Sequence, residues 1–472
     1  MTDPVSADPV DELLPQKFQI NAWTGGPPAG ASGPAAEQAE TWIFRNAPPT
    51  VRTYLRAPEP ADPRNWQDER VGWGLVLAET PGLSAAALAR ADDAPEPIRQ
   101  LVADRSGTVF RYRPGWEHRF RFLRDYKNGK DVAIAGSAPG TKPGHLPRYL
   151  LIYGSPADVP WTLQYELNAS CSVGRLSLTG DALANYVGAL RAGWKASAQP
   201  YHTLVWAVNH GGTDITVLMR DVIAERVQAR YKADNDINAN AVFLDGPPDA
   251  TAARLRQELA HHQPGVIVTT SHGMTGPLDQ LDVMRAQLGM LVDQSLALVR
   301  PEDLLNDWEP NGAIWYAHAC CSAGSDAQSL FTGVVQTDSE IDKVLQGVAK
   351  LGALVSPLPQ ALLGARRPLR AFVGHVEPTF DWTLRQPANR QVMTDALEKA
   401  LYENLMRPAP VGFAFRELYD RLGGLYVGYE NSRRDFNAGG NTQSSMLYHL
   451  LVARDIQSLV ILGDPTAMLP ID

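Results

Sequence analysis

The sequence predicts an α/β protein whose mostly parallel sheet is flanked by helices. From about residue 147 onward, short apolar runs alternate with amphipathic stretches of helical length. This alternation favours a parallel sheet that is covered on both faces. Hydrophobic residues make up 44% of the 472 residues and charged residues 20%, which is typical of a globular chain and excludes a wholly disordered or fibrous one.

The apolar and helical patterns place the elements in order along the chain. Strands are expected at 149–153, 203–208, 241–244, 266–269, 313–317, 353–355, 369–373 and 458–462. Helices are expected at 181–195, 216–231, 251–262, 329–351, 389–406 and 414–422. Further strands are expected at 71–77, 109–113 and 119–122, where the last two runs alternate with period two, as half-buried strands do.

The segment 136–144 is rich in glycine and proline, and we interpret it as a linker. It separates an N-terminal accessory region at 1–140, which we expect to be irregular and partly β, from two α/β regions. These are a first subdomain at 141–235 and a larger domain at 236–472.

Composition and charge indicate which partners to exclude and which compartment to expect. The net charge is −9, which argues against a general nucleic-acid binder because such proteins need a basic surface. No run of 18 apolar residues is present, so no membrane span is expected. The acidic N-terminus lacks the pattern of a signal peptide, and three cysteines make no disulfide framework. We therefore expect a cytoplasmic protein with reduced thiols.

Two of the expected strands end in reactive groups. The run 265–270 leads into Ser271-His272-Gly273, and the run 313–317 leads into His318-Ala319-Cys320-Cys321. Sites in open parallel sheets form in loops beyond the carboxyl ends of the strands, so a thiol and an imidazole from two such loops can share one cleft. His272 lies 48 residues before Cys320, close to the His-to-Cys spacing of the caspase signature.

These residues predict nucleophilic catalysis. The thiolate of Cys320 would attack a peptide carbonyl, and His272 would protonate the departing amine. The backbone N–H groups of Gly273 and Cys320 would form the oxyanion hole, and an electropositive pocket would assist the thiolate. We choose Cys320 over Cys321 because caspase-like motifs have alanine directly before the nucleophile, as Ala319 stands before Cys320.

The paired motifs resemble those of the caspase-like cysteine peptidases, which include caspases, metacaspases, separase, gingipains and bacterial CHAT-domain proteases. The gingipain-like and CHAT members fit best, because three further segments are similar to theirs. The first comprises 147–154, Asp158-Val159-Pro160 and Val173-Gly174-Arg175. The others are Gly374-His375-Val376-Glu377 and Gly463-Asp464-Pro465-Thr466 near the C-terminus. The resemblance covers about residues 147–472.

The resemblance implies a caspase-type α/β fold, in which 141–235 is a gingipain-like first subdomain and 236–472 the caspase-like catalytic domain. It implies a cysteine-type endopeptidase with a Cys–His dyad and no cofactor, acting on a polypeptide. By analogy it suggests a role in bacterial defence, with a dedicated protein partner as the substrate. Unlike gingipains, which are secreted, this chain shows no signal peptide, and Cys320 lacks the neighbouring aspartate of metacaspases.

Two alternatives stay open at this point. The chain could be a catalytically silent caspase-like interaction module. A metal site made of His318, Cys320, Cys321 and a distant histidine is disfavoured, because adjacent ligands suit tetrahedral zinc poorly and no Cys-x-x-Cys is present. We therefore expect no metal. Cys171 is interpreted as structural.

Other polar residues receive weaker assignments. His210, followed by two glycines, is interpreted as part of a turn, and His375 either lines the cleft or packs in the interior. The specificity for the residue before the cleaved bond stays open. Acidic candidates for a pocket that takes Lys or Arg are Asp158, Glu166 and Asp326, whereas Arg175 would favour Asp.

Overall fold

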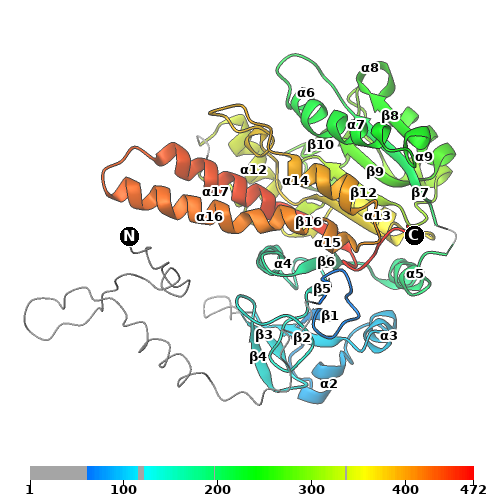
Figure 1. Ribbon diagram of the computed structural model, residues 1–472, viewed down its shortest axis with the longest axis vertical. Helices are drawn as coiled ribbons and strands as arrows, with labels where there is room; N and C mark the ends of the chain where they lie inside the picture. Colours follow the sequence, from blue (N-terminus) through cyan, green and yellow to red (C-terminus); the bar gives the residue numbers. More distant parts are fainter. Residues whose placement is uncertain (1–60, 115–121, 196, 335–336, 472) are drawn as a thin grey trace, which may run out of the picture. The chain divides into compact units, whose positions relative to one another are not determined.

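A sheet of twelve strands runs through the part of the chain that the structure describes, in the order β4-β3-β2-β1-β5-β6-β16-β15-β12-β9-β7-β8. The structure is a computed structural model and describes residues 61–114, 122–195, 197–334 and 337–471. The α/β class and the mostly parallel sheet flanked by helices are therefore confirmed (Figure 1). The expected irregularity of residues 1–60 lies outside the described residues.

The strands of this sheet are β1 (Trp73–Ala78), β2 (Thr108–Tyr112), β3 (Phe122–Asp125), β4 (Lys130–Ala133), β5 (Tyr149–Tyr153), β6 (Ser172–Leu176), β7 (Gln199–Ala207), β8 (Ala241–Asp245), β9 (Pro264–Thr270), β12 (Ile314–His318), β15 (Ala371–His375) and β16 (Leu459–Gly463). Two small ladders lie beside it. They pair β10 (His272–Gly273) with β11 (Leu291–Val292), and β13 (Gly324–Ser325) with β14 (Leu354–Val355).

Apart from β3 and β4, which pair in the antiparallel sense beside β2, the sheet consists of two parallel halves that run in opposite directions. One half contains β2, β1, β5, β6 and β16, and the other contains β15, β12, β9, β7 and β8. The halves meet where β15 pairs with β16 in the antiparallel sense. Every residue of β9 and of β12 is buried, which explains why these strands read as continuous apolar runs.

The helices of the described chain are α2 (Ala85–Arg90), α3 (Glu96–Asp104), α4 (Trp161–Asn168), α5 (Gly180–Arg191), α6 (Ile215–Met219), α7 (Glu225–Ala233), α8 (Gly246–Asp249), α9 (Ala252–His262), α10 (Leu281–Gln287), α11 (Pro301–Asp307), α12 (Glu340–Ala349), α13 (Pro357–Gly364), α14 (Asp395–Glu398), α15 (Val411–Ala414), α16 (Arg416–Asn437) and α17 (Gln443–Ser458). The π-helical segment η1 (Arg220–Ala224) joins α6 to α7, and η4 (Lys399–Asn404) extends α14. Short 3₁₀ turns are η2 (Asn238–Asn240) and η3 (Asp381–Thr383).

Several expected elements have different bounds in the structure. The helix expected at 329–351 is only α12, because Ser339 caps its first turn by accepting a hydrogen bond from the Asp342 N–H. The strand expected at 353–355 belongs to the small ladder of β13 and β14. The helix expected at 414–422 continues to Asn437 as α16 and is followed by α17, which the sequence patterns did not reveal.

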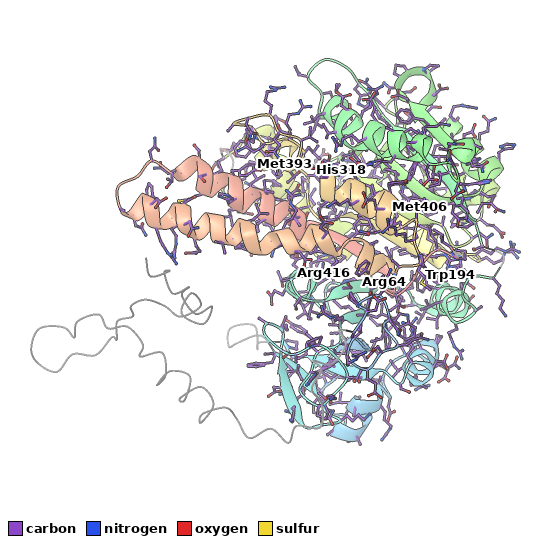
Figure 2. All side chains as sticks on the ribbon, viewed as in Figure 1. Arg64, Trp194, His318, Met393, Met406 and Arg416 are labelled. Carbon is purple, nitrogen blue, oxygen red and sulfur yellow. The ribbon has the colours of Figure 1, made fainter. Side chains whose placement is uncertain are left out.

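Helices α16 and α17 lie side by side as a long hairpin that extends away from the sheet (Figure 1). The base of α16 is fastened by Arg416, which is labelled in Figure 2. Its guanidinium donates hydrogen bonds to the carbonyl oxygens of Asn168, Ala169 and Cys171, at the end of α4. These bonds satisfy carbonyl groups that a helix end leaves unpaired.

The segment 136–144 connects β4 to β5 within the large sheet. Strands from the expected accessory region and from the expected α/β regions therefore share one sheet, and residues from Ala61 onward form one compact unit. Within the described residues, no helix has both the length and the apolar character needed to cross a membrane.

Candidate active site

Three neighbouring strands bring the candidate residues to one edge of the sheet. In β9, Thr270 pairs with Ala207 of β7 on one side and with His318 of β12 on the other. Because these strands are parallel, their carboxyl ends lie at the same edge. Asp214 lies in the loop after β7, His272 directly after β9, and Cys320 in the loop after β12.

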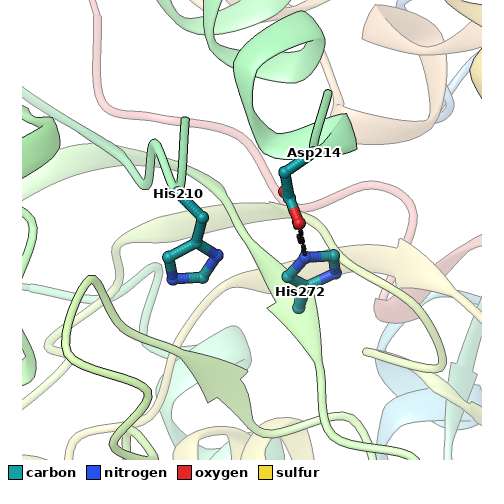
Figure 3. A group of neighbouring side chains, drawn as sticks. All are labelled: His210, Asp214 and His272. Atoms are coloured by element: carbon teal, nitrogen blue, oxygen red, sulfur yellow. Dashed lines mark hydrogen bonds and ion pairs between the residues drawn. The ribbon is translucent and has the colours of Figure 1, made fainter. Parts of the chain in front are cut away.

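His272 is held by a carboxylate. Its Nε2 lies 3.1 Å and 3.0 Å from the two oxygens of Asp214, and a dashed line marks this contact in Figure 3. A carboxylate only accepts hydrogen bonds, so Nε2 carries the hydrogen, and Nδ1 of the neutral ring has the lone pair. An imidazole held in this tautomer can accept a proton at Nδ1, which is the role a general base requires.

Asp214 is itself positioned by its own helix. It is the N-cap of α6, and its Oδ1 accepts hydrogen bonds from the N–H of Thr216 at 2.8 Å and from the Thr216 hydroxyl. Partial burial raises the pKa of Asp214, but the hydrogen bonds from Thr216 and His272 outweigh this effect and hold the pKa at about 2. The carboxylate is therefore ionised at neutral pH.

Cys320 and Cys321 have different surroundings. Cys320 is half-buried, and its sulfur accepts a hydrogen bond from the Thr379 N–H at 3.4 Å. Cys321 is fully buried in an apolar cluster with Met284, Leu288, Val348 and Leu351. Of the two adjacent cysteines, only Cys320 is partly exposed.

The pKa of the Cys320 thiol is raised, chiefly by burial, while the Thr379 N–H acts in the opposite direction. The buried carboxylate of Asp455 adds to the increase. We expected an electropositive pocket that would lower the thiol pKa, whereas burial and the Asp455 carboxylate raise it. A protonated thiol needs a base to become a nucleophile.

The backbone of the histidine loop lies directly against that of the cysteine loop. A Cβ added to Gly273 would lie 1.9 Å from the carbonyl oxygen of Cys320, so only glycine permits this contact. Gly273 follows His272 in the short strand β10, where the Met274 N–H bonds to Met290 across the ladder. By the alternation of an antiparallel ladder, the Gly273 N–H points away from β11. The two expected oxyanion donors thus belong to touching segments.

The cysteine loop is also fixed by the segment that follows β15. The N–H of Cys321 bonds to the carbonyl oxygen of Glu377 at 3.2 Å, and the N–H of Ala323 bonds to that of His375 at 2.8 Å. Glu377 is buried, and burial raises the pKa of its carboxyl to about 7. The segment Gly374-His375-Val376-Glu377, singled out in the sequence, therefore supports the loop that carries the thiol.

Among the described residues, no hydrogen bond joins the Cys320 sulfur to His272. The structure places the two side chains on adjoining loops whose backbones touch at Gly273 and Cys320.

The specificity candidates are separated by the structure. Arg175 is buried, donates to Gln164 Oε1 at 3.0 Å and to the Gly154 carbonyl oxygen, and lies 4.5 Å from the Trp161 ring. Burial lowers its pKa to about 9. Arg175 therefore has a structural role, and its guanidinium is not exposed for contact with a substrate. Asp326, directly after β13, is the acidic candidate nearest in sequence to Cys320.

The other two acidic candidates lie along a different loop and helix. Asp158 accepts a hydrogen bond from the Ser155 hydroxyl at 2.6 Å, and Glu166 is on α4. Both line a cavity with Tyr112 and Leu163, near the other half of the sheet.

Another group of ionisable side chains is buried beneath the cysteine loop. His318 at the end of β12 and His375 at the end of β15 meet edge to face, with ring centroids 5.0 Å apart. Asp455 of α17 lies 4.0 Å from His375. His375 therefore packs in the interior, which is the second of the two roles considered for it.

Two residues of the site escaped the sequence interpretation. Asp214 was not considered, and His210 was interpreted as part of a turn. The ring of His210 in fact stacks beside that of His272, with centroids 5.6 Å apart (Figure 3). Both residues follow the strand expected at 203–208. This position could have indicated that they lie at the same edge of the sheet as His272 and Cys320.

Comparisons with protein-family models, with curated proteins and with solved structures each found no match to this chain.

Proposed function

We propose that this chain is a caspase-like cysteine endopeptidase in which Cys320 and His272 cleave a polypeptide. The observation that carries the proposal is the backbone contact between Gly273 and Cys320. It joins the two loops that the sequence motifs single out. The hydrogen bond that His272 donates to Asp214 supports it further, because it leaves the other nitrogen of His272 free to act as a base.

The proposed reaction follows from the groups present. Nδ1 of His272 takes the proton of the Cys320 thiol, and the sulfur attacks the carbonyl carbon of the substrate. The N–H groups of Gly273 and Cys320 stabilise the oxyanion. The imidazolium, stabilised by Asp214, then gives its proton to the leaving amine, and a thioester remains. A water molecule, deprotonated by His272, hydrolyses this thioester and restores the thiol.

Because the pKa of the Cys320 thiol is raised, the proposed reaction needs His272 as a base. Burial raises the pKa of Cys320, so the resting enzyme would hold a thiol rather than a thiolate. Proton removal by His272 would accompany the attack. Cys321 is a poor candidate for the nucleophile, because it is fully buried among apolar side chains and burial raises its thiol pKa far above the ordinary value.

The test compares four proteins with a peptide library and with a peptide chloromethyl ketone that alkylates reactive thiols. We expect the wild-type protein to cleave peptides and to be alkylated at position 320, as located by mass spectrometry. Cys320→Ala and His272→Ala should lose at least roughly a thousandfold in kcat/KM. Cys321→Ala should retain most activity, because its sulfur only packs in the interior.

The fold of each variant is checked by its thermal unfolding, since loss of activity matters only in a folded protein. If Cys321→Ala is inactive and Cys320→Ala is active, the nucleophile is the other cysteine. A wild-type protein that neither cleaves any peptide nor reacts with the ketone is a catalytically silent interaction module, and the peptidase proposal is wrong.

A further inference from the structure

Three side chains at the candidate site offer metal-binding atoms that lie close together. His210, Asp214 and His272 each present one ligand atom, and these atoms all lie within 4.8 Å of one another. Figure 3 shows the three side chains converging from the loop after β7 and from β10. The peptidase reaction uses Asp214 and His272 but has no task for His210.

The hydrogen bonds of His210 prepare one of its nitrogens for a metal. Its Nε2 lies 3.1 Å from the carbonyl oxygen of Asp293. A carbonyl only accepts hydrogen bonds, so Nε2 carries the hydrogen and Nδ1 is left with a lone pair. Metal-binding histidines usually donate their second ring N–H to a backbone carbonyl or a carboxylate in this way.

Asp214 is equally prepared. Its carboxylate is held by the Thr216 N–H and hydroxyl, and such outer contacts orient carboxylates that bind metals. Two imidazoles and one carboxylate, with a fourth position open to solvent, form a set typical of zinc. Calcium and magnesium prefer oxygen ligands throughout.

The spacing requires only a small movement. Zinc bonds to nitrogen and oxygen measure about 2.1 Å, so ligand atoms around a tetrahedral zinc lie roughly 3.4 Å apart. The ligand atoms lie within 4.8 Å of one another, so no pair must approach by more than about 1.4 Å, which rotation of half-buried side chains can supply.

We propose that His210, Asp214 and His272 bind one Zn²⁺ ion and that this ion inhibits the peptidase. The inhibition rests on the proposed function. Zinc would bind His272 through Nε2, the atom that now donates to Asp214. The ring stays neutral, and its one hydrogen moves through solvent from Nε2 to Nδ1. With Nδ1 protonated, His272 has no lone pair with which to accept the thiol proton.

The first test is a direct binding measurement on the full chain with Zn²⁺, by equilibrium dialysis. We expect one ion per wild-type chain. His210→Phe, which keeps an aromatic ring beside His272 but removes the ligand nitrogen, should bind at least about tenfold more weakly. Cys320→Ala should bind as the wild type does, and X-ray absorption should show nitrogen and oxygen ligands without sulfur.

The second test measures peptide cleavage in the presence of Zn²⁺. Wild-type activity should fall over the same concentration range as binding. The activity of each protein is expressed relative to its own rate without zinc, and on this scale His210→Phe should need at least about tenfold more zinc for the same inhibition.

Equal zinc affinity of the wild type and His210→Phe would overturn the proposed site. So would loss of binding in Cys320→Ala with a Zn–S distance near 2.3 Å, which would indicate a Cys–His site instead. Binding without inhibition would refute the regulatory role while leaving the metal site and the peptidase intact. If the protein proves to have no peptidase activity, the dialysis and absorption results still decide whether the metal site exists.

Discussion

Asp214 combines a local and a long-range role. It caps α6 through the Thr216 N–H, and it binds His272, which lies 58 residues further along the chain. Only the second role bears on the proposed peptidase reaction. A substitution that keeps the cap and removes the charge therefore separates the two roles.

We expect Asp214→Asn to lower kcat by about tenfold to a thousandfold with little change in KM. Asparagine caps helices as well as aspartate does, but its amide can hold His272 in the wrong tautomer. Asp214→Glu retains a carboxylate and should recover part of the activity. Steady-state kinetics and thermal unfolding of both variants check this. If kcat falls by the same factor in both variants and both also lose stability, Asp214 has a structural role only.

At the scale of elements, the hairpin of α16 and α17 contains glycines with different surroundings. Gly423 and Gly424 lie within α16, and a Cβ added to either would meet no atom within 4 Å. Gly428 lies one turn further on, where an added Cβ would come within 2.6 Å of the His449 ring on α17. The helix is thus packed closely at one glycine and open at the other two.

We expect Gly423→Ala and Gly424→Ala each to stabilise the protein by about 0.5–1 kcal/mol, because alanine loses less conformational entropy in a helix than glycine. Gly428→Ala is the matched control and should lose this gain, since the His449 ring must move. Chemical unfolding of the three variants measures the differences. If Gly428→Ala stabilises as much as the other two, α16 and α17 do not pack in this register.

At the scale of the whole molecule, the first strands and the last strand are bound together. Asp464, directly after β16, is buried and accepts a hydrogen bond from the Trp73 indole N–H at 3.2 Å. It also pairs with Arg105 at 3.1 Å. The segment Gly463-Asp464-Pro465-Thr466, noted in the sequence for its resemblance to peptidases, thus has a structural role in joining the N-terminal strands to the end of the chain.

The interior beneath the cysteine loop holds unpaired polar atoms. His318 Nε2, His375 Nε2 and Asp455 Oδ1 are buried and have no hydrogen-bond partner within the described chain. They line a cavity of about 40 Å³ that Met393 also borders. Burial lowers the pKa of His318 to about 4 and that of His375 well below its usual value, so both rings are neutral at pH 7.

This cluster predicts a pH dependence of stability. Burial raises the pKa of Asp455 from 3.8 to about 7. The contribution of this carboxyl to the free energy of unfolding is fully present below pH 3.8 and is lost as the pH rises to about 7. The reason is that Asp455 ionises at lower pH in the unfolded state than in the folded state. At 1.4 kcal/mol per pKa unit, the loss amounts to roughly 3–5 kcal/mol.

Asp455→Asn should remove this loss, so the variant should gain stability relative to the wild type as the pH rises from 4 to 8. The measurement is the free energy of unfolding by denaturant across that range. Asp435→Asn, at an exposed position of α16, is the control and should stay parallel to the wild type. Parallel curves for Asp455→Asn would show that its carboxyl does not titrate in this range in the folded protein.

The local pattern of the sequence was enough for the α/β class, for most strands of the second half of the sheet and for the two loops with His272 and Cys320. Apolar runs identify buried strands wherever both faces are covered. Helix ends were less predictable, as α12 and α16 show, because caps and tertiary packing decide where a helix stops.

The local sequence pattern predicts that a histidine and a cysteine follow two strands, and Ala319 favours Cys320 over Cys321. The pairing of β7 with β9 became evident only in the folded chain, where it brings Asp214 and His210 next to His272. The tertiary structure likewise buries Cys321 and leaves Cys320 partly exposed. The reason is physical. Periodicity encodes which face of a strand is buried, whereas the order of strands in a sheet depends on contacts between residues far apart in the chain.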